Sequence, residues 1–198
     1  MMRILLVRHD ESEWNASRRL QGQADIALSD RGREQARLLR PMIEALAPDA
    51  VIASDLARAA ETARILGADT AALTPALREI DVGNWTGEPI TQIIAREPEH
   101  YAGWRAGTHA PEGGETWAAF RSRVAAAVER AAEGTNHLLV VCHGGVIRAL
   151  IEHFLELAPA RIIPVGPASL TALRLGKGPA RLELFNVTPG RLELSAPD

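Results

Sequence analysis

Residues 4–10 read Ile-Leu-Leu-Val-Arg-His-Asp, and this stretch decides the fold. Four apolar residues lead directly into three polar ones. A short apolar run of this kind is typical of a strand that is buried on both faces, as in a sheet covered by helices. We therefore predict a first strand over residues 4–7 that delivers Arg8, His9 and Asp10 at its carboxyl end.

The same arrangement recurs at residues 137–143, which read His-Leu-Leu-Val-Val-Cys-His. In open α/β sheets the ligand crevice lies at the carboxyl ends of the strands. His9 and His143 are therefore expected to face one site although they lie far apart in the sequence. A lone histidine at a strand end is usually a structural residue, but its recurrence favours a paired-histidine site.

Strand and helix patterns alternate along the rest of the chain. Apolar residues recur at three- and four-residue steps over residues 30–47, which predicts a helix with Ser29 as its N-cap. Further strands are predicted at 50–53, about 70–73, 137–142, 170–175 and 181–187, and further helices at about 56–66, 115–132 and 144–157. This order predicts an α/β fold, a three-layer sandwich in which a mostly parallel central sheet carries helices on both faces.

We expect one domain over residues 1–198. Within it, residues of about 81–114 contain Gly, Pro and aromatic side chains with little regular period, and we interpret them as a rim or lid of short helices and loops. Trp85 and Trp104 are candidates for the mouth of a substrate site, whereas Trp117 and Phe120 have the spacing of core residues.

Composition and charge narrow the classes of function. Apolar residues make up 46% and charged residues 24% of the chain, which is ordinary for a globular domain. A formal charge of -3 and a pI near 6.1 disfavour a nucleic-acid binder. The first apolar run is too short for an export signal or a membrane span. A single cysteine, Cys142, excludes an internal disulfide, and the cytoplasm is the expected compartment. A homodimer is possible.

Two histidines and nearby carboxylates raise the alternative of a zinc site. However, the chain has no HxH, HxxxH or HExxH spacing, and Arg8 directly precedes His9. A guanidinium disfavours a neighbouring cation, whereas it binds phosphate oxygens in a bidentate manner. The sequence therefore predicts a site for an anion, with no metal and no cofactor.

A family resemblance begins at residues 8–15, which read Arg-His-Asp-Glu-Ser-Glu-Trp-Asn and resemble the Arg-His-Gly signature of the histidine phosphatase (phosphoglycerate mutase-like) superfamily. Further motifs match in the same order: Gln21-Gly22, residues 28–36 (Leu-Ser-Asp-Arg-Gly-Arg-Glu-Gln-Ala), residues 54–63 (Ser-Asp-Leu-Ala-Arg-Ala-Ala-Glu-Thr-Ala), residues 78–87 (Arg-Glu-Ile-Asp-Val-Gly-Asn-Trp-Thr-Gly) and His143-Gly144-Gly145. The resemblance covers nearly the whole chain and implies a phosphoglycerate mutase-like fold.

The resemblance also implies a role for each matched residue. The neutral imidazole of His9 takes the phosphoryl group as a nitrogen nucleophile. Arg8, Arg58 and His143 stabilise the charge on its oxygens. Glu79 transfers the proton that the leaving group needs.

Four further residues are expected to bind the substrate. Asn15, Gln21 and the backbone of Gly22 would contact the phosphate or the leaving group. Gly144 opens a helix whose N-terminal amides favour an anion.

Superfamily members normally have glycine where this chain has Asp10. A carboxylate that points into the site would repel phosphate and raise the pKa of His9. We predict a phosphomonoesterase that acts through a phosphohistidine intermediate on a small phosphorylated metabolite, because residues 78–87 resemble the phosphatase branch. Two alternatives stay open. One is a phosphotransferase of the phosphoglycerate mutase type, and the other is a weakly active or inactive phosphate-binding homologue, because of Asp10.

Overall fold

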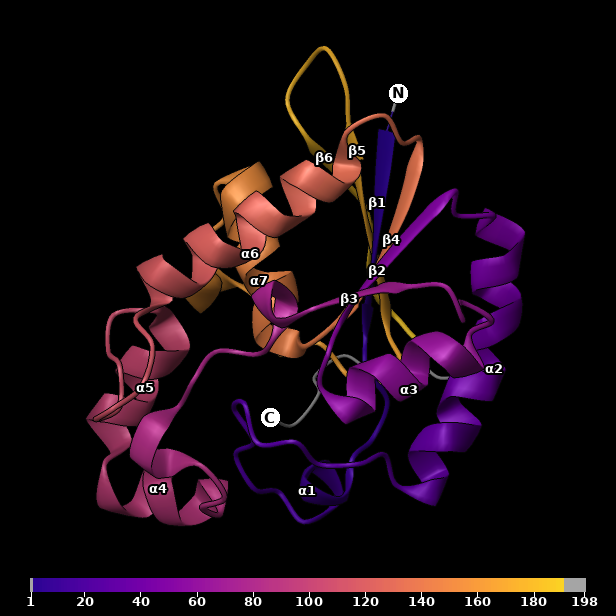
Figure 1. Cartoon of the computed structure of the whole chain (residues 1–198). Coiled ribbons are helices and arrows are strands. Elements are labelled where there is room, and N and C mark those ends of the chain that lie inside the picture. Colours follow the sequence, from indigo (N-terminus) through magenta and orange to yellow (C-terminus); the bar gives the residue numbers. More distant parts are fainter. Residues whose placement is uncertain (1, 191–198) are drawn as a thin grey trace.

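The structure is a computed structural model that describes residues 2–190 (Figure 1). Residue 1 and residues 191–198, which the predicted domain also includes, lie outside the described residues. A central sheet lies between two layers of helices, and a third group of short helices gathers near the carboxyl ends of its parallel strands (Figure 1).

The sheet has six strands in the order β3-β2-β4-β1-β5-β6. In chain order these are β1 Met2–Arg8, β2 Ala50–Ser54, β3 Ala72–Thr74, β4 His137–Cys142, β5 Leu170–Leu175 and β6 Arg181–Val187. Strand β4 pairs in parallel with β1 and β2, and β2 pairs in parallel with β3. Only β5 runs against the others, because it is antiparallel to both β1 and β6. The mostly parallel sheet is confirmed.

Strand β1 is buried on both faces, as its apolar run predicts. Successive side chains of a strand point to opposite faces. Ile4 and Leu6 join one hydrophobic cluster, and Leu5 and Val7 join the other. The chain therefore has two cores, one on each side of the sheet.

Two pairs of helices cover the faces of the sheet (Figure 1). Helices α2 (Asp30–Leu46) and α3 (Ala57–Ile65) lie on one face, and α6 (Trp117–Ala132) and α7 (Gly144–Leu155) lie on the other. Apolar residues of each pair pack against the strands, which confirms the three-layer sandwich.

The bounds of three helices can be compared with the predicted ones. Helix α2 begins as predicted, because the Ser29 hydroxyl accepts a hydrogen bond from the Gly32 amide. Helix α6 begins two residues later than predicted, since Thr116 is its N-cap and accepts from the Ala119 amide. Helix α7 ends two residues earlier, where Glu156 adopts a left-handed conformation with φ of 56°.

Short helices gather near the carboxyl ends of the parallel strands. They are α1 Glu13–Ala16, η1 Pro75–Leu77, η2 Gly83–Trp85, α4 Ile90–Arg96, α5 Pro98–Ala106 and η3 Pro159–Arg161. Three of them, η2, α4 and α5, belong to the predicted rim at residues 81–114, and α4 and α5 lie below α6 in Figure 1. Helix α1 was not expected, and a capping box between Ser12 and Asn15 forms it.

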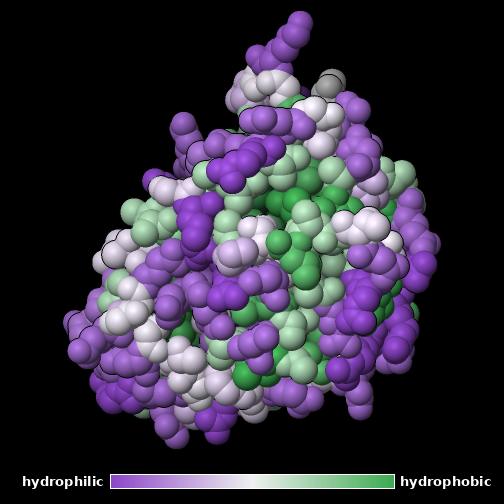
Figure 2. Space-filling view, viewed as in Figure 1, coloured by the Kyte–Doolittle hydropathy of each residue, from purple (hydrophilic) through white to green (hydrophobic). Residues whose placement is uncertain are grey.

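Apolar side chains gather over the edge strand β3 on one face of the molecule (Figures 1 and 2). Figure 2 shows them in the middle of the face that Figure 1 presents, where strand β3 lies and where Leu73 is 55% exposed. The homodimer stays a prediction. Within residues 2–190, no helix is both long and apolar enough to cross a membrane.

Candidate active site

The parallel pairing of β1 with β4 brings the two predicted histidines together. Arg8 lies opposite Cys142 in the register, and the His9 amide donates to the Cys142 carbonyl at 2.8 Å. The rings of His9 and His143 then lie with their centroids 5.1 Å apart in an edge-to-face arrangement. Two sequence-remote strand ends therefore form one site.

Hydrogen bonds set the tautomer of His9. Its Nδ1 lies 2.7 Å from the backbone carbonyl of Asp10, which can only accept, so Nδ1 carries the proton. The opposite nitrogen, Nε2, accepts from Nε of Arg58 at 3.3 Å. Burial holds the pKa of His9 well below its usual value, and the charges of Arg58 and Arg8 lower it further. Near neutral pH, His9 is a neutral imidazole whose Nε2 carries a free electron pair.

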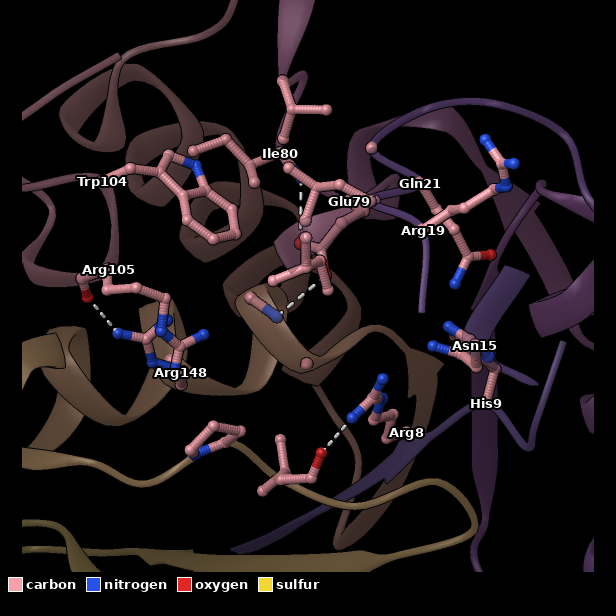
Figure 3. A pocket seen from close by; sticks show the side chains of 18 of the residues that line it. Arg8, His9, Asn15, Arg19, Gln21, Glu79, Ile80, Trp104, Arg105 and Arg148 are labelled. Carbon is pink, nitrogen blue, oxygen red and sulfur yellow. Dashed lines mark hydrogen bonds between the residues drawn. The ribbon is translucent and has the colours of Figure 1, made fainter. Parts of the chain in front are cut away.

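Arg58 is fixed at the start of helix α3. Its Nη1 donates to the Ala24 carbonyl at 2.7 Å and its Nη2 donates to the Gly22 carbonyl at 2.9 Å. Burial lowers the pKa of Arg58 to about 10, so the guanidinium stays charged near neutral pH. Arg8 is held in a similar way, since its Nη1 donates to the Val165 carbonyl (Figure 3).

The predicted substrate-binding amides share one buried anchor, Ser12. Its hydroxyl lies 2.9 Å from Oδ1 of Asn15 and 2.8 Å from Oε1 of Gln21. With both oxygens turned towards Ser12, the NH₂ groups of Asn15 and Gln21 are the donors that remain for the cavity, which both residues line (Figure 3). Ser12 was not predicted from the sequence, because Asn15 rather than the usual Glu or Gln completes its capping box.

Glu79 lies on the cavity wall opposite Arg8 (Figure 3). Its Oε2 accepts from the Gly145 amide and its Oε1 accepts from the Ile80 amide, both at 2.9 Å. The neighbouring Arg78 instead forms a bidentate pair with Asp55. The carboxylate of Glu79 is therefore anchored by backbone amides at the rim of the cavity.

Glycines permit these close approaches. A Cβ atom on Gly145 would lie 2.2 Å from Oε1 of Glu79. Gly22 has φ of 51°, and a Cβ atom there would lie 2.7 Å from Cγ2 of Val82. Gly22, Gly144 and Gly145 all line the cavity, the last two at the N-terminus of α7.

His143 lies beside His9 but is not among the residues that line the cavity. Its side chain is fully buried, and its Nε2 lies 2.9 Å from the Ser54 hydroxyl. Burial holds its pKa well below the usual value, with further lowering by Arg58 and His9. His143 is therefore neutral and packs against the ring of His9.

Asp10 points away from the cavity. Its side chain is 0% exposed, and its Oδ2 accepts from the Thr62 hydroxyl at 2.9 Å. Burial raises the pKa of Asp10 to about 7. The pKa of His9 is lowered rather than raised. The intrusion of a carboxylate, which the sequence left open, does not occur.

The tryptophans are distributed between the core and the cavity wall differently from the prediction. Trp85 is 1% exposed and belongs to the core, so its predicted place at the mouth is wrong. Trp104 does line the cavity, and Trp117 lines it as well as packing against Phe120. Trp85 is buried because Tyr101 and Trp104 of helix α5 pack over it.

Two cavity-lining arginines were also missed. Arg105 lies on α5 and Arg148 lies on α7. Arg148 has a sequence signal, because it is the one charged residue within the apolar stretch of residues 146–151. Cys142, in contrast, is a buried strand residue whose thiol pKa is raised by burial. Within residues 2–190, no group of His, Cys, Asp or Glu side chains is placed to hold a metal ion.

A neutral imidazole beside two guanidiniums, at the carboxyl end of a parallel sheet and facing an anchored carboxylate, is an arrangement that can carry out phosphoryl transfer. The family model of the histidine phosphatase superfamily (branch 1) matches residues 4–188. The chain belongs to this superfamily and is an enzyme of the histidine phosphatase class.

Relatives and solved structures agree with this assignment. The chain is 36% identical over 188 residues to the glucosyl-3-phosphoglycerate phosphatase of Mycobacterium tuberculosis (strain ATCC 25618 / H37Rv), covering 86% of this chain and 84% of the relative. It is 37% identical over 161 residues to phosphoglycerate mutase-like protein 4 of Arabidopsis thaliana, covering 75% and 69%. A solved mycobacterial glucosyl-3-phosphoglycerate phosphatase in complex with VO3 superposes with a TM-score of 0.87 at 32% identity, covering 95% of this chain and 100% of that one.

Proposed function

We propose that the protein is a phosphomonoesterase in which Nε2 of His9 takes the phosphoryl group from a small phosphorylated metabolite. The observation that carries this proposal is the state of His9. Its Nδ1 proton is held by a backbone carbonyl, its Nε2 is unprotonated, and that atom lies beside the guanidinium of Arg58. This is the state that an attacking nitrogen needs.

In the first step the electron pair of Nε2 forms a bond to phosphorus, and the bond from phosphorus to the leaving oxygen breaks. Arg8 and Arg58 stabilise the negative charge on the phosphoryl oxygens. The amide NH₂ groups of Asn15 and Gln21 are placed to add hydrogen bonds. In its protonated form, Glu79 gives its proton to the leaving oxygen, which departs as an alcohol, and is left as a carboxylate.

In the second step water attacks the phosphohistidine. The carboxylate of Glu79 takes a proton from that water while the oxygen bonds to phosphorus and the bond to Nε2 breaks. Inorganic phosphate leaves, and His9 and Glu79 return to their starting states. His143 acts from within the wall, where its ring supports that of His9.

Substitution of His9 by alanine tests the proposal. We expect the purified protein to hydrolyse p-nitrophenyl phosphate, and H9A to lose at least about 10³-fold in kcat because the covalent route is closed. Near-UV circular dichroism of H9A shows whether the fold is kept. Equal rates for the two proteins would overturn the mechanism, and no hydrolysis by the wild type would favour the inactive phosphate-binding homologue.

A mutase is the second candidate, because several similar proteins are named as phosphoglycerate mutases or as phosphoglycerate mutase-like. Incubation with 3-phosphoglycerate and a 2,3-bisphosphoglycerate primer separates the two activities. We expect release of inorganic phosphate. Rapid formation of 2-phosphoglycerate without phosphate release would instead establish the mutase. The cytoplasm remains the compartment that we propose for either activity.

A further inference from the structure

Glu79 lines the cavity, but the segment that carries it is held by contacts outside the cavity. The carboxylate itself accepts hydrogen bonds from the amides of Gly145 and Ile80. These bonds orient the side chain, whereas the place of its backbone depends on residues 75–78, which lead from strand β3 to Glu79 through the short helix η1. A single 3₁₀ turn has few hydrogen bonds of its own. The contacts of residues 75–78 with other elements therefore decide where Glu79 lies.

Arg78, the neighbour of Glu79, provides the first of these contacts. It is not among the residues that line the cavity, and its side chain pairs with Asp55 instead. Its Nε donates to Oδ1 of Asp55 at 2.8 Å, and its Nη2 donates to Oδ2 at 2.7 Å. Two parallel hydrogen bonds fix the direction of a guanidinium as well as its distance. The Arg78 guanidinium also holds the pKa of Asp55 below its usual value, so the pair is charged near neutral pH.

Asp55 is a well-placed anchor because it follows strand β2 next to the paired histidines. The residue before it is Ser54, which is 0% exposed and whose hydroxyl lies 2.9 Å from Nε2 of His143. The ring of His143 packs against that of His9. The pair of Arg78 with Asp55 thus connects the backbone beside Glu79 to the strand end that supports His9.

Arg123 of helix α6 holds the same segment from a second element. Its Nη1 donates to the backbone carbonyls of Ala76 and Arg78 at 3.0 and 3.1 Å. Its Nε and Nη2 donate to the two carboxylate oxygens of Glu115 at 3.0 and 2.7 Å, which keeps the guanidinium in place. The residues just before Glu79 are therefore held both by the end of β2 and by α6.

Stability alone gives the pair of Arg78 with Asp55 little reason to exist. Their side chains are 38% and 25% exposed, and ion pairs that reach solvent contribute little to the free energy of folding. We infer that Arg78 is a positioning residue, which acts through its paired hydrogen bonds to Asp55 to place Glu79 for proton transfer. This inference rests on the proposed function, in which Glu79 protonates the leaving oxygen.

The acidity of the leaving alcohol distinguishes a positioning role from a structural one. p-Nitrophenol is acidic, so its anion can leave with little help from a proton donor. Benzyl alcohol is far less acidic, so the hydrolysis of benzyl phosphate depends more strongly on a proton donor. A displaced Glu79 therefore slows the hydrolysis of benzyl phosphate more than that of p-nitrophenyl phosphate, whereas a partly unfolded enzyme loses both activities alike.

Arg78→Gln is the primary variant. We expect the ratio of kcat/KM for benzyl phosphate to kcat/KM for p-nitrophenyl phosphate to fall by about 10-fold. This is less than the loss of about 10²-fold for a misplacement of about 1 Å, because the amides of Gly145 and Ile80 still hold the carboxylate. The melting temperature should change little.

Asp55→Asn tests the same contact from its other partner. We expect a similar fall in the ratio, and the double variant D55N/R78Q should lower it little further, because both substitutions act through one contact. Arg78→Lys keeps the charge but loses the planar fork, so its ratio should also fall. Arg40→Gln removes an arginine from an exposed ion pair with Glu44 on α2 and should leave the ratio as in the wild type.

Glu79→Gln provides the reference, since it removes the proton and should lower the ratio most. A fall in E79Q together with unchanged ratios in R78Q and D55N would overturn the inference and leave the proposed function standing. A fall in R78Q that R78K restores to the wild-type value would also overturn it, because charge alone would then explain the effect. An unchanged ratio in E79Q would instead overturn the proposed role of Glu79 itself, and the inference with it.

Discussion

Asp10 shows how a single residue can replace glycine beside His9 without entering the site. Its carbonyl orients His9, while its carboxyl points to Thr62 on helix α3. The Thr62 hydroxyl also lies 2.8 Å from the Arg58 carbonyl, and a hydroxyl has one proton to donate. A protonated Asp10 can donate a hydrogen bond to the Thr62 hydroxyl, which then donates to the Arg58 carbonyl. An ionised Asp10 instead accepts the one hydrogen bond that the Thr62 hydroxyl can donate.

This arrangement predicts a pH-dependent contribution of Asp10 to stability. Burial raises the pKa of Asp10 from 3.8 to about 7, so between these values the folded state holds a proton that the unfolded state has lost. Stability from this group is therefore fully present below about pH 4 and is lost as pH rises to about 7. The loss is at most about 4 kcal/mol.

Asp10→Asn removes this titration. We expect the free energy of unfolding of D10N, relative to that of the wild type, to increase as pH rises from 4 to 7.5. Urea unfolding at each pH measures both values. The difference cancels the contributions of other groups, including His9 and His143. Asp69→Asn, at an exposed position, controls for the loss of one charge. Parallel profiles for D10N and the wild type would contradict the buried, proton-holding state of Asp10.

At the scale of elements, the N-terminus of α7 is the part that positions Glu79, the proton donor that we propose. Helix α7 starts directly after β4, so its first amides lie at the carboxyl edge of the sheet. The Gly145 amide holds Oε2 of Glu79, and the lack of a Cβ atom lets the carboxylate approach. The helix thus positions a residue that comes from the loop after η1.

Gly145→Ala should displace Glu79. The added Cβ atom would lie 2.2 Å from Oε1, so the carboxylate must leave its present position at the Gly145 amide. We expect kcat/KM for p-nitrophenyl phosphate to fall by about 10²-fold, the scale of a displacement of about 1 Å in an active site. The melting temperature should change little, because the strain falls on one side chain.

Gly144→Ala is the graded comparison. A Cβ atom there makes ordinary contacts of 3.6 Å with Arg8 and Val165, so a smaller loss of kcat/KM is expected. Gly176→Ala, where a Cβ atom meets nothing within 4 Å, controls for the substitution itself. A loss in G145A no larger than in G144A would show that the contact with Glu79 does not place the carboxylate.

The elements were largely predictable because their periodicities are strong. The run of residues 4–7 predicted a doubly buried strand, and the recurrence at residues 137–143 predicted the meeting of His9 and His143. Capping geometry is weaker in sequence, so helix α1 and its anchor Ser12 were missed. Trp85 was misplaced for another reason, since whether an aromatic ring faces the core or the cavity depends on how α5 packs over it.

At the scale of the whole molecule, the site is assembled from distant segments. His9 follows β1, Arg58 starts α3, Glu79 follows η1, and Arg148 lies in α7. Backbone hydrogen bonds join the rim to residues 18–20, which follow α1. The Leu20 amide donates to Glu88, and the amides of Gly87 and Ile90 donate to Leu20 and Arg18.

These bonds favour a single folding unit, as the sequence predicts, rather than a separately folding rim. The two ends of the rim are held together, because the Asn84 amide donates to the Glu112 carbonyl, and the Glu115 amide, just before α6, donates to the Asp81 carbonyl. The segment that leads into the rim is held as well, since Nη1 of Arg123 on α6 donates to the carbonyls of Ala76 and Arg78. The rim is therefore tied by backbone hydrogen bonds both to residues 18–20 and to Glu115, the residue that precedes the N-cap of α6.

The tryptophans make this testable. Trp14, Trp85, Trp104 and Trp117 are the four in the chain, and they lie in or next to the rim, whereas most of the helical signal comes from α2, α6 and α7. Tryptophan fluorescence thus reports the rim, and far-UV circular dichroism reports the sandwich. In thermal unfolding we expect the two signals to change at the same temperature, because one cooperative unit unfolds in one step. A fluorescence transition several degrees below the circular dichroism transition would show instead that residues 81–114 unfold as a separate lid.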